Sequence, residues 1–83
     1  MLTVTFLHPN TDATIALELP RETKFAALTP LLYERKFIRP QRPGFSYLYA
    51  GHLCGMEHTL GDYVPEKART MTVQVFDVPV IMV

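Results

Sequence analysis

The 83-residue sequence predicts one two-layer α+β domain, in which a mixed sheet packs against a single helix. Two alternating apolar segments open the chain, a segment with helical spacing follows, and shorter alternating segments complete it. Hydrophobic residues make up 48% of the chain and charged residues 19%, which is typical of a globular domain and not of a disordered one. The length allows one domain with a compact core.

The N-terminal segments are predicted to form a β-hairpin. Residues 2–7 alternate, with Leu2, Val4 and Phe6 on one face, which is the period of a half-buried strand. Residues 8–12 are rich in turn formers, and residues 14–19 alternate again. Two such strands joined by a short turn favour a hairpin.

A helix is predicted over about residues 24–37, with Thr23 as its N-cap. Its apolar residues have the i, i+3, i+7 spacing of one helix face: Phe25, Leu28 and Leu32. Pro30 leaves two alternatives. The proline kinks a continuous helix at a cost of roughly 3 kcal/mol, or the helix restarts with Thr29 as cap and Pro30 at its first position.

The second half of the chain is predicted to add three strands. Residues 46–50 and 52–54 form the third and a short fourth strand, and residues 70–76 alternate as the last one. Residues 59–63 resemble a short helical turn. We expect the first and last strands to lie parallel at the centre of the sheet.

Two motifs carry a resemblance to a known superfamily. Residues 47–52 are Tyr-Leu-Tyr-Ala-Gly-His, and residues 59–63 are Thr-Leu-Gly-Asp-Tyr. In this order and spacing the chain resembles ubiquitin-like proteins, closely over about residues 47–76 and more loosely before them. The resemblance implies a β-grasp fold with four to five strands packed on one helix, spanning residues 1–77, and an apolar tail at residues 78–83.

The loop Pro40-x-Arg42-x-Gly44 is similar to that of the bacterial YukD/EsaB group, which accompanies type VII secretion systems. The resemblance implies a non-catalytic protein-interaction module that serves such a secretion system. The expected partner is another protein, such as a component of the secretion apparatus. An alternative is a ubiquitin-like modifier or sulfur carrier.

The C-terminal residues argue against this alternative. A modifier or carrier needs a Gly-Gly end that can enter the narrow site of an activating enzyme. The sequence has no Gly-Gly pair and ends in Val-Pro-Val-Ile-Met-Val. We expect Val80, Ile81 and Val83 to make contacts instead, with the domain itself, with a second copy in a homodimer, or with a partner.

The resemblance also implies a binding surface. Ubiquitin binds partners through a sheet face centred on an isoleucine, with a valine and a histidine on the last strand. The matching positions here are Leu48, Gln74 and Thr72, and we add the nearby His52 as an expected contact residue. The alternative is that Leu48 is a single exposed apolar side chain with no binding role.

Residues 52–58 contain the only cluster of metal-ligand types, His52-x-Cys54-x-x-x-His58. A zinc site needs about four well-spaced ligands, so we expect no metal and interpret Cys54 as a buried apolar residue. No orienting residue or oxyanion donor set accompanies Cys54 as a nucleophile, and no phosphate loop is present. We therefore expect neither an enzyme nor a bound cofactor.

Charge and composition restrict the partners further. Eight basic and eight acidic residues cancel, whereas nucleic-acid binders carry a basic excess, so we expect no nucleic acid. No apolar segment approaches the ~20 residues that span a bilayer, so we expect no direct membrane insertion. Asn10, Asp12 and Glu18 interrupt any signal-peptide pattern, and the single cysteine suits a reducing compartment. The expected location is the cytoplasm.

Overall fold

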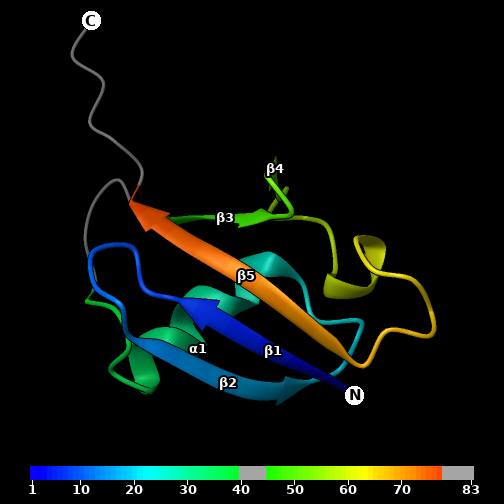
Figure 1. The fold of residues 1–83 in the computed structure, drawn as a ribbon, viewed down its shortest axis with the longest axis horizontal. Coiled ribbons are helices and arrows are strands. Elements are labelled where there is room, and N and C mark those ends of the chain that lie inside the picture. Colours follow the sequence, from blue (N-terminus) through cyan, green and yellow to red (C-terminus); the bar gives the residue numbers. More distant parts are fainter. Residues whose placement is uncertain (40–44, 78–83) are drawn as a thin grey trace, which may run out of the picture.

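The computed structural model describes residues 1–39 and 45–77. Its strands form one mixed sheet in the order β2-β1-β5-β3-β4 (Figure 1). Their bounds are β1 (Leu2–Leu7), β2 (Thr14–Leu19), β3 (Phe45–Tyr49), β4 (His52–Leu53) and β5 (Thr70–Asp77). The first and last strands are parallel neighbours at the centre, with Thr3 opposite Thr70 and Leu7 opposite Gln74. The predicted α+β, β-grasp fold is confirmed.

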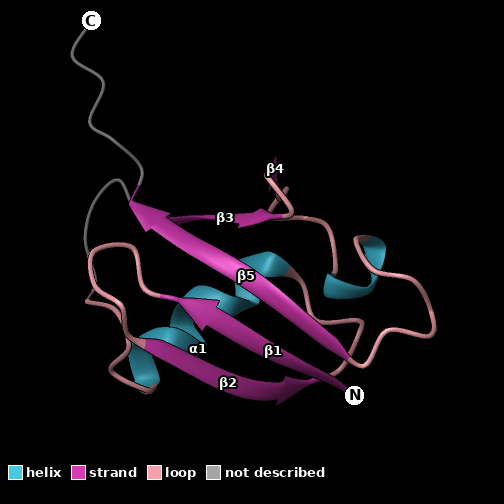
Figure 2. Cartoon of the chain, viewed as in Figure 1, coloured by secondary structure: helices cyan, strands magenta, loops and turns pink. Residues whose placement is uncertain are grey.

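The helical layer covers one face of this sheet (Figure 2). It contains the 3₁₀ helix η1 (Phe25–Ala27) and the helix α1 (Leu28–Glu34), and a second 3₁₀ helix, η2 (Leu60–Asp62), lies between β4 and β5. Alternate residues of β1 and β5 point toward this layer, which is why those strands show period-two burial. The core residues are Leu2, Val4, Phe6, Phe25, Leu28, Leu32, Ile38, Phe45, Tyr47, Cys54, Leu60, Val64, Met71, Val73 and Val75.

The helix around Pro30 is interrupted, but not where the sequence suggested. A 3₁₀ turn precedes α1, and the residue before α1 is Ala27, not Thr29. Pro30 is the third residue of α1, where the backbone N–H would have no partner inside the α-helix. The proline therefore removes no hydrogen bond from α1. Thr23 is not a helix cap either, because Lys24 precedes η1 and no side chain caps it.

Helix α1 ends at Glu34, three residues before the predicted end, because the chain enters a left-handed conformation. Lys36 has φ 59°, its amide donates to the carbonyl of Tyr33 at 2.9 Å, and the amide of Phe37 donates to that of Leu32 at 3.0 Å. This pair of bonds is the Schellman arrangement that usually uses glycine at the left-handed position. A lysine there keeps the motif at a conformational cost.

Arg21 fastens the connection after η2 to the end of β2. The half-buried guanidinium donates to the carbonyls of Ala68, Val64 and Pro65 at 3.2, 3.2 and 3.0 Å. Charged donors to carbonyls make stronger bonds than neutral ones, so one side chain orders a segment without regular structure.

Over residues 1–39 and 45–77, no helix is long and apolar enough to cross a membrane.

Candidate functional site

The sheet face opposite α1 is the surface on which the sequence placed its candidate residues. Among the described residues, the helical layer lies on the other face only (Figure 1). The side chains that alternate onto this outer face from β1, β5 and β3 are uncharged over the described positions: Thr3, Thr5, Leu7, Ser46, Leu48, Thr70, Thr72, Gln74 and Phe76. These three strands therefore present an uncharged surface, with apolar groups set among hydroxyls. The edge strand β2 adds one charge to the same face, because Glu18 lies opposite Thr3.

The strand register aligns four of its side chains in one row. Gln74 on β5 is opposite Leu7 of β1 and also opposite Leu48 of β3. Leu48 is in turn opposite Leu53 of β4. Residues directly opposite each other share a face, so Leu7, Gln74, Leu48 and Leu53 form a row across four strands. We call these four residues the outer-face row.

Leu53 is the most exposed member of the outer-face row. Its exposed fraction is 65%, and among the described residues Met1 is the only other large hydrophobic residue that is strongly exposed. An exposed leucine beside the half-buried Leu48 offers an apolar contact of two adjacent side chains. The sequence analysis did not select Leu53, because a two-residue strand gives too little alternation to assign its face.

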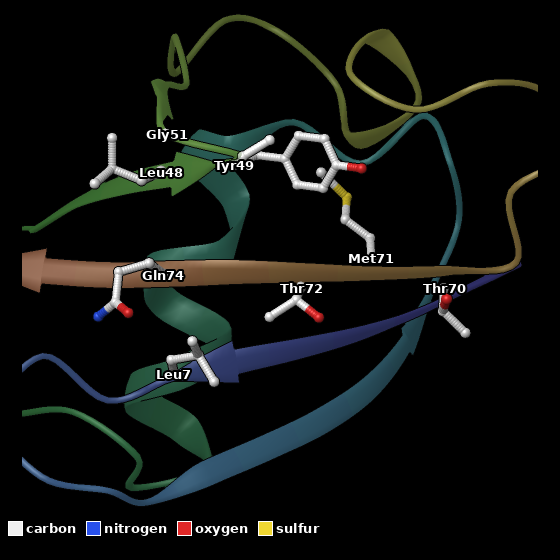
Figure 3. A pocket seen from close by; sticks show the side chains of 9 residues that line it. Leu7, Leu48, Tyr49, Gly51, Thr70, Met71, Thr72 and Gln74 are labelled. Atoms are coloured by element: carbon white, nitrogen blue, oxygen red, sulfur yellow. The ribbon is translucent and has the colours of Figure 1, made fainter.

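A shallow hollow of about 550 Å³ adjoins the outer-face row and is lined by three of its members but not by Leu53 (Figure 3). Leu48 and Gln74 border it, with Leu7 nearby on β1 and Thr72 next along β5. Its lining is completed by Tyr49, Ala50, Gly51, Thr70 and Met71. Three of the expected contact residues, Leu48, Thr72 and Gln74, thus lie together.

His52, the fourth expected contact residue, does not line this hollow. It is exposed on β4 and lies opposite Tyr49, whereas the next residue, Leu53, lies opposite Leu48. Since successive side chains of a strand leave opposite faces, the residue that β4 contributes to the outer face is Leu53.

The turn between β3 and β4 sets the position of Leu53. Ala50 and Gly51 form the two-residue connection, with φ 51° and 82°. Two successive positive φ values are characteristic of the type I′ hairpin turn, whose twist matches that of the strands. Ala50 is strained in this conformation, and both turn residues line the hollow. The strain is stored beside the candidate surface.

Cys54 belongs to the core and not to this surface. Its side chain is 3% exposed, and its amide donates to the carbonyl of Tyr47 at 2.8 Å. Burial raises the pKa of the Cys54 thiol, and a backbone hydrogen bond at Tyr49 acts in the opposite direction. The thiolate needed for a nucleophile is therefore disfavoured.

His58 has a local role at η2. Its Nδ1 lies 3.5 Å from a carboxylate oxygen of Asp62, and its ring is edge-on to Tyr63. Asp62 also accepts a hydrogen bond of 2.9 Å from the amide of Thr59, which forms a capping box. In the described part of the chain, no group of three or more His, Cys, Asp or Glu side chains could hold a metal ion.

The expected tail contacts cannot be placed on this surface. Val80, Ile81 and Val83 lie outside the described residues. The chain matches no protein-family model and no curated protein.

Proposed function

We propose that this protein is a non-catalytic interaction module that binds another protein through the outer-face row. The observation that carries the proposal is the alignment of Leu7, Leu48 and Leu53 on a sheet face that no described element covers. Protein-binding surfaces draw most of their affinity from a few apolar side chains that become desolvated within a polar rim. Here the threonines of β5 supply that rim.

The lack of charge on the outer face of β1, β5 and β3 defines the chemistry of the partner. Phosphate-bearing partners are held mainly by lysine and arginine, and the described lining of the hollow contains neither. The surface suits a folded protein that projects an uncharged apolar side chain into the hollow, with hydrogen-bonding groups around it for the threonine hydroxyls. Gln74 offers one further polar group at the centre of the row.

We further propose that the partner is a component of a bacterial type VII-like secretion system, and that the protein acts in the cytoplasm. This part rests on the resemblance to the YukD/EsaB group, which is carried by the loop at residues 40–44. The motifs at residues 47–52 and 59–63 carry only the wider resemblance to ubiquitin-like proteins. The single cysteine supports the location, because the fold makes no disulfide and needs no oxidising compartment.

Site-specific photo-crosslinking in the source cells tests the surface. A photoreactive amino acid at position 53 should capture one protein, and the same group at position 27, an exposed alanine in the helical layer, should not. With the captured protein purified, Leu48→Asp should weaken binding by roughly thirtyfold, the equivalent of about 2 kcal/mol. Ala27→Asp, which adds the same charge elsewhere, should leave the affinity unchanged. Equal capture at both positions would contradict the proposed surface.

Complementation tests the secretion role separately. In cells that lack this protein, the wild type and Ala27→Asp should both restore export of the proteins that the secretion system releases, whereas Leu48→Asp should not. If deletion leaves export unaffected, the secretion role is wrong, even where the outer face binds a protein. An adenylate or thioester formed with an activating enzyme and ATP, seen by intact mass, would instead support the modifier alternative.

A further inference from the structure

Strand β2 forms an open edge of the sheet. In the described part of the chain it pairs with β1 only, and the opposite edge strand, β4, has two residues. Natural edge strands are usually shortened, bulged or interrupted by proline or several charges, since a free edge can pair with another strand. β2 has six residues without proline or glycine, and Glu18 is its only charge.

Two hydrogen bonds show which residues of β2 face outward. The amide of His8 donates to the carbonyl of Ala13 at 3.0 Å, and the amide of Thr3 donates away from β2, to Arg69 at 2.9 Å. In an antiparallel ladder this alternation means that even-numbered residues of β1 bond to β2. The backbone groups of β2 that point away from β1 are therefore those of Thr14, Ala16 and Glu18.

The apolar side chains of β2 are incompletely covered. Ile15, Leu17 and Leu19 pack against the core but are only partly buried, whereas Leu2 and Val4 on the neighbouring strand are fully buried. A strand added beside β2 would cover the exposed parts of these side chains and pair the free backbone groups at the same time.

We propose that this edge pairs with β2 of a second copy of the chain, antiparallel, with Ala16 of both copies opposite each other on a two-fold axis. In this register Thr14 of each copy is opposite Glu18 of the other. Every outward-facing amide and carbonyl of these three residues then has a partner. Because Glu18 of each copy faces Thr14 of the other, the two-fold symmetry does not bring the two Glu18 carboxylates together.

The neighbouring registers are less favourable for reasons visible in the chain. A shift in one direction brings Pro20 opposite Thr14, but proline has no amide hydrogen and its carbonyl already accepts a bond from Thr23. A shift in the other direction places Asp12 opposite Glu18, and like charges directly opposite each other are destabilising. The register centred on Ala16 avoids both.

The same register pairs the apolar face. Ile15 of each copy lies opposite Leu17 of the other, in the non-hydrogen-bonded positions where side chains approach most closely. The edge is thus complementary to itself in backbone, charge and apolar contact. This self-complementarity is the argument for a second copy as the occupant, since an unrelated extended peptide would need to match all three features. The edge shares no residue with the outer-face row, although Thr14 lies opposite Leu7. Because the two surfaces are tested by different substitutions, one proposal can be wrong while the other holds.

Cysteine cross-linking tests the register. Opposite Cα atoms in a hydrogen-bonded pair are about 5.5 Å apart, within disulfide range. Ala16→Cys should therefore form a disulfide-linked dimer under mild oxidation. Thr14→Cys should not, because its copy lies about 13 Å away along the strand. A mixture of Thr14→Cys and Glu18→Cys should yield the mixed dimer. The wild type, whose single Cys54 is buried, is the negative control and should form no disulfide-linked dimer.

Sedimentation velocity up to about 1 mM protein tests association without cross-linking. The wild type should show a concentration-dependent dimer, and Ala16→Lys should raise its dissociation constant by about tenfold, because the two added charges face each other. Ala26→Lys, at an exposed alanine outside β2, should leave it unchanged. A chain that stays monomeric throughout, or equal cross-linking by Thr14→Cys and Ala16→Cys, would overturn the proposal. Binding of an extended peptide by such a monomer would assign the edge to a different occupant.

Discussion

The hydrogen bond between Tyr47 and Thr29 links the sheet to the helix inside the core. The two hydroxyl oxygens are 2.7 Å apart, and the Tyr47 side chain is fully buried. Replacing either residue removes the same bond but leaves a different group behind. Tyr47→Phe leaves the half-buried hydroxyl of Thr29, whereas Thr29→Val leaves the buried hydroxyl of Tyr47.

The two substitutions should therefore differ in cost. A hydrogen bond of this kind contributes about 0.5–1.5 kcal/mol net, and Tyr47→Phe should lower the free energy of unfolding by about 1 kcal/mol. Thr29→Val leaves the buried Tyr47 hydroxyl without a hydrogen-bond partner, which costs about 1–3 kcal/mol, so it should be the more destabilising substitution. The double variant should cost less than the sum of the two, because one bond is lost only once.

Urea denaturation of the wild type, both single variants and the double variant provides the measurement. The m-values should stay the same, so that the midpoints report stability alone. Additive effects of the two substitutions, or a smaller loss for Thr29→Val than for Tyr47→Phe, would refute the reasoning. The first result would mean that the bond contributes nothing, and the second that the Tyr47 hydroxyl reaches another partner.

Three further predictions concern the helix end, the buried thiol and η2. Lys36→Gly should raise the free energy of unfolding by about 0.5–1 kcal/mol in urea denaturation, because glycine adopts the left-handed conformation without strain; a loss of stability would contradict it. Burial raises the pKa of the Cys54 thiol above its ordinary value of 9.0. The buried neutral thiol should therefore contribute its full stability below pH 9.0, and this contribution should decline as pH rises through the folded-state pKa. Cys54→Ala should remove this part of the alkaline decline in urea midpoints. The Thr59 amide, which donates to Asp62, holds the pKa of that carboxyl below its usual 3.8. The stability contributed by the ionised carboxylate is therefore present above pH 3.8 and is lost as pH falls through the lowered pKa. In Asp62→Asn the free energy of unfolding should depend less on pH in this acidic range, and an unchanged pH profile would argue against the capping box.

The local elements were largely predictable from sequence. The strands β1, β2 and β5 show period-two alternation because one face of each packs on the core. The alternation involves neighbouring residues, so it can be detected in the sequence alone. The Thr-Leu-Gly-Asp-Tyr segment was predicted to form a short helical turn, and in the structure its threonine and aspartate form a capping box at η2. The interruption at Pro30 was foreseen as one of two alternatives, but its place was not. Whether η1 could precede α1 depends on the amides of Phe25 and Ala26, which bond to distant carbonyls of His58 and Met56.

By itself, therefore, the sequence determined which segments are strands, where the core faces lie and which architecture closes around them. Only the tertiary structure decided that Leu53, not His52, stands beside Leu48, and that Leu7, Gln74 and Leu48 share one row. The physical reason is that alternation is a property of neighbours along the chain, whereas register is set by pairing between strands far apart in it. A one-residue slip exchanges the faces of a whole strand, so no local pattern could have chosen between these rows.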